Sequence, residues 1–78
     1  GFDIYPNPAK NYVYIKRNLS LNNYSNVKIF DLNGKCMKTK AFDDSLIKFD
    51  VSDLSKGIYV IKILGVNNSS VAKIVKFY

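Results

Sequence analysis

Few side chains in this sequence are suited to catalysis, and histidine is absent from it. Without histidine, a serine or cysteine has no imidazole to activate it as a nucleophile, and the lysines form no recognisable activated arrangement. Asp43 and Asp44 are adjacent, but neighbours on an extended segment point to opposite faces, and no further ligands are spaced to complete a metal site. The sequence therefore predicts that this protein is not an enzyme and uses no metal or cofactor.

Cys36 is the only cysteine, so the chain cannot form an internal disulfide. A reactive thiol needs a basic or histidine neighbour that stabilises the thiolate, and histidine is absent. Cys36 lies beside Met37 in a segment that we interpret as an apolar strand. We therefore expect a buried structural thiol.

The formal charge of +6 invites a nucleic-acid-binding interpretation, because neutralisation of phosphates dominates such affinities. The basic residues are spread along the chain without a long run, and Arg17 is the only arginine. We expect no nucleic-acid binding, and lysines that cover solvent faces and protect strand edges. No apolar run approaches the roughly 20 residues of a membrane span, so we expect no membrane insertion. The N-terminus has no signal pattern, so any secretion would be directed from upstream.

A chain of 78 residues is long enough for one small domain. Apolar and polar side chains alternate with a period of two in several short segments, and no segment has convincing helical periodicity. The predicted strands are residues 2–5, 12–16, 27–30, 36–40, 46–51, 58–63 and 71–77, and residues 18–26 are predicted to form a loop. The set predicts an all-β fold, a seven-stranded antiparallel immunoglobulin-like β-sandwich, with a five-stranded barrel as the alternative.

Residues 53–63 join the clearest turn signal to the strongest run of strand-forming residues. Gly57 can take a positive φ at the corner, and Ile58 to Ile63 is β-branched or aromatic at nearly every position. This pattern predicts a largely buried strand. Tyr59 follows the corner and is placed to bury its ring and donate its hydroxyl to the backbone, as in the tyrosine corner of β-sandwiches.

Tyrosines and phenylalanines are numerous enough to form a platform on which sugar rings stack, although tryptophan is absent. Tyr12, Tyr14 and Tyr24 are the candidates to face outward together. In a small domain most such rings are expected to serve packing or cross-strand pairing. An immunoglobulin-like adhesive or carbohydrate-binding accessory module is therefore the alternative function.

Four motifs follow one another along the chain: Tyr5-Pro6-Asn7-Pro8, then residues 27–35, 51–59 and 73–76. In this order and at this spacing they resemble the type A C-terminal sorting domain that directs cargo through the type IX secretion system of Bacteroidetes. The resemblance spans residues 5–77 and implies a seven-stranded immunoglobulin-like sandwich. The motif residues to which we assign mainly structural roles are Pro6, Asn7, Pro8, Asp31, Gly34, Asp53, Leu54, Gly57 and Tyr59.

The resemblance implies that residues 1–78 are a single C-terminal sorting domain excised from a larger secreted protein. Cargo of this kind enters the periplasm by an N-terminal signal peptide, and the type IX secretion translocon recognises the sorting domain. A sortase-like cysteine peptidase then removes the domain in many cases, and the cargo is attached to lipopolysaccharide at the outer-membrane surface or becomes extracellular. Unpaired edge strands would also allow a homodimer.

Recognition is expected at the end of the chain. We hypothesise that residues 71–78 present a strand edge that the translocon reads by backbone pairing, as in β-augmentation. Lys73 and Lys76 would add charge recognition. The expected recognition residues are Lys73, Ile74, Val75, Lys76, Phe77 and Tyr78.

Overall fold

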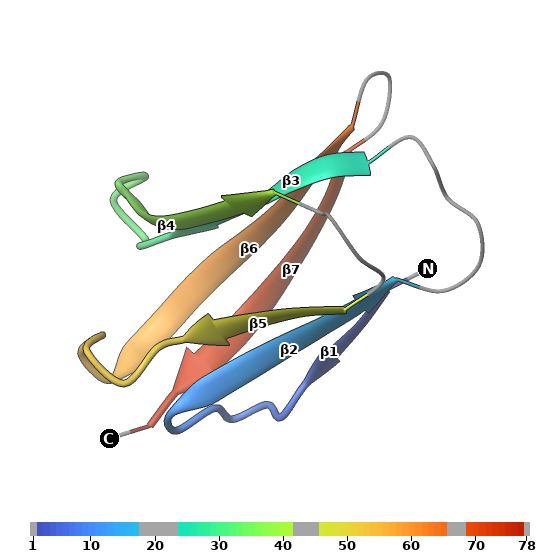
Figure 1. Ribbon diagram of the computed structural model, residues 1–78. Coiled ribbons are helices and arrows are strands. Elements are labelled where there is room, and N and C mark those ends of the chain that lie inside the picture. Colours follow the sequence, from blue (N-terminus) through green and yellow to red (C-terminus); the bar gives the residue numbers. More distant parts are fainter. Residues whose placement is uncertain (1, 18–23, 42–45, 66–68, 78) are drawn as a thin grey trace.

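The computed structural model describes residues 2–17, 24–41, 46–65 and 69–77, and these form seven strands (Figure 1). Every strand pair is antiparallel. The strands are β1 (Phe2–Tyr5), β2 (Tyr12–Arg17), β3 (Tyr24–Phe30), β4 (Cys36–Ala41), β5 (Leu46–Asp50), β6 (Gly57–Gly65) and β7 (Ser69–Lys76).

The strands lie in two layers, a three-stranded sheet of order β1-β2-β5 and a four-stranded sheet of order β4-β3-β6-β7. Figure 1 shows the two sheets facing each other. Pairing of β2 with β5 in one sheet, and of β3 with β6 and β6 with β7 in the other, is the strand distribution of an immunoglobulin-like sandwich. The predicted seven-stranded fold is confirmed, and the five-stranded barrel is not the architecture.

The core consists of the inward side chains of both sheets. Alternation along each strand places every second residue inside, as predicted for Val13 and Ile15 on β2 and for Ile47 and Phe49 on β5. Each such side chain stabilises the fold by about 1.5–3 kcal/mol relative to an exposed one. The buried hydrophobic residues are Ala9, Val13, Ile15, Val27, Ile29, Ile47, Phe49, Val51, Leu54, Tyr59, Ile61, Ile63 and Ile74.

The prediction that residues 58–63 form a largely buried strand is wrong for one face of β6. Its inward residues are buried, but Ile58 and Lys62 are exposed and Val60 is half-buried. β-Branched residues favour a strand on either face, so the composition alone could not reveal which face is covered.

Two further expectations need correction. Cys36 is exposed, because it begins edge strand β4, and its Sγ lies 3.5 Å from the carbonyl oxygen of Lys38. β3 begins at Tyr24, inside the segment predicted as a loop, because residues 24 and 26 already pair with β6. Pairing with β6 fixes the strand from Tyr24 on, and β4 joins on the other side at Asn26.

The turn between β3 and β4 forms the predicted hairpin. The Oδ1 atom of Asp31 accepts hydrogen bonds from the backbone N–H groups of Asn33 and Lys35, both at 2.9 Å. Gly34 has a φ of 87°, which a residue with a Cβ rarely adopts. No neighbour would contact a Cβ at Gly34, so the backbone conformation, not space, requires glycine.

Candidate functional site

The last strand, β7, lies at an edge of the four-stranded sheet, and its residues alternate between exposed and half-buried at the start and between exposed and buried from Lys73 on. Ile74 and Lys76 point inward and are buried, Lys76 with 2% of its surface exposed. Lys73 and Val75 point outward, and exposed Phe77 follows the strand. The predicted recognition stretch is thus divided between the core and the surface, and Tyr78 lies outside the described residues.

The side chain of Asn7 covers part of the free edge of β7. Its Oδ1 accepts a hydrogen bond from the backbone N–H of Val75 at 2.9 Å, and its Nδ2 donates to the carbonyl oxygen of Lys73 at 3.3 Å. An amide side chain offers the same acceptor and donor as a peptide group. The Asn7 side chain thus pairs with β7 as the backbone of a neighbouring strand would. Pro6 and Pro8, on either side of Asn7, have no backbone N–H to donate to β7.

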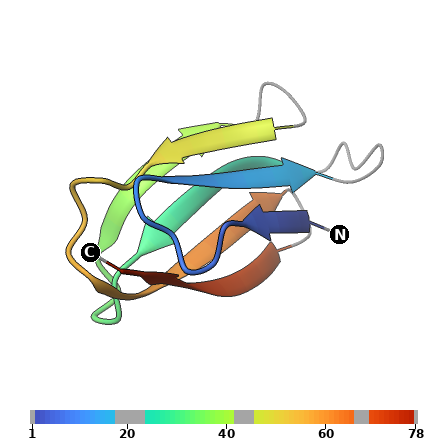
Figure 2. The same cartoon turned by 90° about the horizontal axis from the view of Figure 1, so that it is seen from below.

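Ala9 extends this cover by backbone pairing. Its N–H donates to the carbonyl oxygen of Val75 at 2.7 Å, and its carbonyl oxygen accepts from the N–H of Phe77 at 3.0 Å. The pairing is parallel, with Ala9 opposite Lys76, and Ala9 is fully buried. Figure 2 shows the segment between β1 and β2 lying beside β7. We call residues 7–9 the edge clip.

The edge clip changes the hypothesis of recognition by β-augmentation. β7 is an edge strand, as predicted, but its backbone between Lys73 and Phe77 is already paired with the clip. A partner strand cannot pair there while the clip is in place. The burial of Lys76 also does not fit its expected role in charge recognition at the surface. What this part of β7 offers is its outward face, where Lys73 and Val75 lie.

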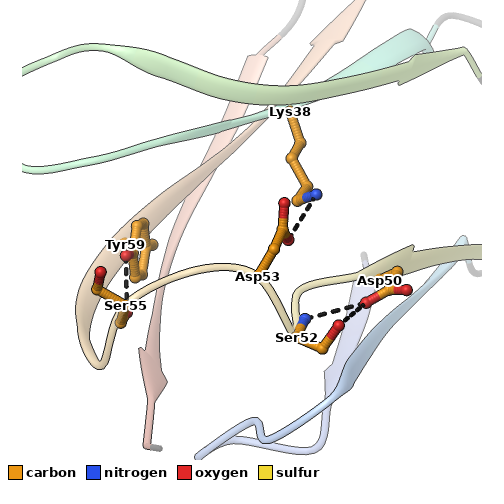
Figure 3. Close-up of polar contacts among 6 residues, drawn as sticks. All are labelled: Lys38, Asp50, Ser52, Asp53, Ser55 and Tyr59. Atoms are coloured by element: carbon orange, nitrogen blue, oxygen red, sulfur yellow. Dashed lines mark hydrogen bonds and ion pairs between the residues drawn. The ribbon is translucent and has the colours of Figure 1, made fainter.

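The turn between β5 and β6 is held by short polar contacts, shown in Figure 3. Asp50 accepts hydrogen bonds from the Ser52 hydroxyl at 2.6 Å and from the Ser52 backbone N–H at 3.0 Å. Asp53 pairs with Lys38 of β4, with 2.9 Å between Nζ and Oδ1, so this contact joins the turn to the opposite sheet. Leu54 is buried in the core.

Tyr59 confirms the predicted tyrosine corner. Its ring is in the core, with 6% of the residue exposed, and its hydroxyl donates to the carbonyl oxygen of Ser55 at 2.7 Å. Figure 3 shows the ring beside the chain that turns back before β6. Gly57, with a φ of 151°, provides the change of direction between Ser55 and Tyr59. The bond holds the turn at a fixed distance from the strand.

The two aspartates of this turn predict a modest loss of stability in acid. The hydroxyl and N–H of Ser52 lower the pKa of Asp50 below its ordinary value of 3.8, and the hydrogen bond from Lys38 lowers the pKa of Asp53. A carboxyl group whose pKa is lower in the folded state than in the unfolded state stabilises the fold at any pH above its ordinary pKa. That stabilisation is lost as the pH falls through the pKa of the folded state. Both groups are exposed, so solvent screening keeps the effect small.

Urea unfolding measured from neutral pH to below 3.8 should therefore show stability falling only at the acid end. A Ser52→Ala variant should lose less stability in acid than the unmodified chain, and NMR titration should show the pKa of Asp50 rising toward its ordinary value. Identical Asp50 titration curves in both proteins would contradict the role assigned to Ser52.

The sequence interpretation missed the outward face of the four-stranded sheet. We define this face by the outward residues of β3, β6 and β7: Lys28, Phe30, Ile58, Val60, Lys62, Val71, Lys73 and Val75. The register places Ile58 opposite Val75 and Val60 opposite Lys73, so these side chains form one continuous surface. The alternation along residues 58–62 was the signal that could have revealed it.

Two of the three tyrosines proposed for sugar stacking, Tyr12 and Tyr14, lie on the outward side of β2, where Tyr12 is 42% exposed. Tyr14 stacks on Tyr5 of the neighbouring strand, with 5.6 Å between the ring centroids, and Nζ of Lys48 lies 4.0 Å from the centroid of the Tyr12 ring. Tyr24 is on β3, in the other sheet. These contacts are the cross-strand pairing expected for most of the rings.

Other features bear on the chemistry of the chain. Across the described ranges, no group of three or more Cys, Asp or Glu side chains lies close enough together to hold a metal ion. Asp43 and Asp44 lie outside those ranges. The part of the chain that the structure describes contains no helix of the length and apolar character needed to cross a membrane.

Comparison with known proteins adds three findings. A family model described as "Secretion system C-terminal sorting domain" matches residues 3–77. A search of curated proteins finds no match. Among solved structures, the fold is similar to part of PorZ from Porphyromonas gingivalis, described as an essential bacterial surface component of the type-IX secretion system, with a TM-score of 0.82 and 19% sequence identity. The similarity covers 100% of this chain and 12% of the PorZ chain.

Proposed function

Because this chain belongs to the family of secretion system C-terminal sorting domains, we propose that residues 1–78 are the terminal address of a larger secreted protein. Domains of this family are the C-terminal sorting signals of type IX secretion, and the type IX machinery recognises them. Their cargo travels to the cell surface. The proposal is that this domain takes an upstream protein from the periplasm across the outer membrane.

The observation that carries the proposal is the alternation of β7. Ile74 and Lys76 are buried and serve the fold, whereas Lys73 and Val75 are displayed outward beside exposed Phe77. A sorting machinery can read only what a folded domain displays. We therefore assign recognition to the outward side chains of the last strand, with the edge clip holding the strand in place.

The export test must leave the fold intact. Deleting residues 73–78 would remove Ile74 and the partners of the edge clip, so a loss of export would not distinguish recognition from unfolding. Replacing Lys73 with glutamine and Val75 with threonine changes only outward side chains on a strand that keeps its backbone. We expect export of a fused fluorescent reporter to fall by roughly fivefold or more, as for loss of a few central contacts of an interface.

A matched control lies on the other sheet. Lys16 and Leu46 are directly opposite each other on β2 and β5 and are both exposed, so Lys16→Gln with Leu46→Thr changes the same chemistry elsewhere. The measurement is the fraction of reporter outside cells of a type IX-competent host, with urea unfolding of each purified variant. Equal export by both double variants, at equal stability, would rule out recognition at β7.

Further steps of export belong to the same proposal. A sortase-like cysteine peptidase would remove the domain after transport, and the cargo would then be anchored to surface lipopolysaccharide or released. A homodimer through edge strands stays a prediction. The edge clip limits it, because β7 can offer a second copy only the part of its edge that precedes Lys73.

A further inference from the structure

We propose that the outward face of the four-stranded sheet docks an extended, acidic segment of a partner protein that carries apolar side chains. This surface extends beyond the terminal strand to β3 and β6, and the inference goes beyond the export role. The proposed interaction is binding of a partner segment to this face, and its affinity can be measured on the purified chain without any export assay.

The first support is a shallow groove of about 410 Å³ on this face. Its apolar lining comes from Phe30, Leu32, Val60 and Val71, and two of these are largely open to solvent, Leu32 at 66% and Val71 at 62%. Isolated exposed apolar residues are ordinary, but a continuous set beside a groove indicates a binding surface. A partner that inserted an aliphatic side chain would remove this surface from water.

The second support is the arrangement of charge. Lys28 of β3 and Lys62 of β6 are directly opposite each other on the outward face, and Lys73 is diagonal to Lys62. Like charges opposite each other destabilise a sheet. Within the described residues none of the three lysines has an ion pair. Asp31 also lines the groove, and one oxygen of its carboxylate, Oδ1, accepts hydrogen bonds from two backbone N–H groups of its turn. An acidic partner would relieve the repulsion.

These observations also select the occupant. A second copy of the chain would bring the same lysines to the same face, so self-association there is opposed by charge. Addition of a strand at β7 is blocked between Lys73 and Phe77 by the edge clip. A groove on the face, with apolar lining and cationic neighbours, fits an extended segment in which acidic residues flank aliphatic ones.

The test measures binding of a fluorescein-labelled probe peptide with a leucine-rich centre and aspartates on both sides. Fluorescence anisotropy should show saturable binding that weakens as salt rises. Replacing the leucines of the probe with serine, or its aspartates with lysine, should abolish measurable binding. In NMR spectra the amide shifts that move on titration should come from Lys28, Phe30, Val60, Lys62 and Val71.

Two double variants with the same net charge give the sharpest comparison. Lys28→Gln with Lys62→Gln should weaken binding by roughly fivefold, as for loss of two surface ion pairs at a partly desolvated site. Lys16→Gln with Lys48→Gln changes exposed lysines on β2 and β5 of the other sheet and should leave affinity unchanged. A Val71→Ser variant should also bind more weakly.

Three outcomes would overturn the proposal. Equal weakening by both lysine pairs would mean that net charge alone attracts the probe. Shift changes confined to the three-stranded sheet would place the site elsewhere. Binding of anionic lipid vesicles through these residues, without binding of the peptide, would assign the face to a membrane surface.

Discussion

Replacing Ile74 with alanine should lower the free energy of unfolding by about 3 kcal/mol, within the range of 2–5 kcal/mol found for deletion of large buried aliphatic side chains. Ile74 is 1% exposed and lies directly opposite Tyr59 on the inward side of the four-stranded sheet. Its loss would leave a cavity beside the tyrosine corner. Urea denaturation, followed by circular dichroism or tyrosine fluorescence, measures the change.

The neighbouring residue is the control for this prediction. Val75→Ala shortens an outward side chain on the same strand and should change the free energy of unfolding by less than about 0.5 kcal/mol. The two variants would thus separate what the terminal strand does for the fold from what it displays. Similar losses in both would show that β7 is not divided between core and surface as described.

Asn7→Ala should be the second large effect, a loss of about 2 kcal/mol, since a hydrogen bond contributes roughly 1 kcal/mol and two are removed. The peptide groups of Lys73 and Val75 would then be left to water at an open edge. Asn7→Asp keeps the acceptor for the Val75 N–H but sets a carboxylate oxygen against the carbonyl oxygen of Lys73, so its stability should also stay below that of the unmodified chain. Urea unfolding of the unmodified chain, Asn7→Ala and Asn7→Asp measures the three free energies of unfolding.

Hydrogen exchange locates the effect of Asn7. The amide of Val75 donates to Asn7 Oδ1, so its exchange should accelerate at least about tenfold in Asn7→Ala, the factor that corresponds to 1.4 kcal/mol. Asn11→Ala is the control, because Asn11 is also exposed and its side chain has no hydrogen bond to another described residue. If Val75 exchanged equally fast in both variants, Asn7 would not be its partner.

The sequence was sufficient for the sheet architecture because strands of period two show their alternation directly. Val13 and Ile15, or Ile47 and Phe49, are separated by polar residues, and the structure buries these four. The same criterion failed on β6, where both faces are apolar in part. A prediction that places every apolar residue in the core cannot identify apolar residues on an outward face.

The candidate site was harder to predict, because it depends on contacts between distant segments. Asn7 is 68 residues from Val75, and no local pattern shows that its amide completes the edge of the last strand. The burial of Lys76 has the same origin, since a lysine at a strand end is ordinarily expected outside. The ordered motifs identified the family, whereas the division of labour within the last strand required the three-dimensional structure.

The edge clip also has a mechanical consequence. Figures 1 and 2 show the two ends of the chain at opposite ends of the molecule, and residue 9 runs parallel to residue 76. A pull on the two ends in opposite directions therefore slides the clip and β7 past each other. Their hydrogen bonds are loaded together, in shear, rather than broken one after another as in an opening zipper. The hydrogen bonds of Asn7 and Ala9 therefore share the tension with the pairing of β1 to β2, which lies between the N-terminal end and the clip.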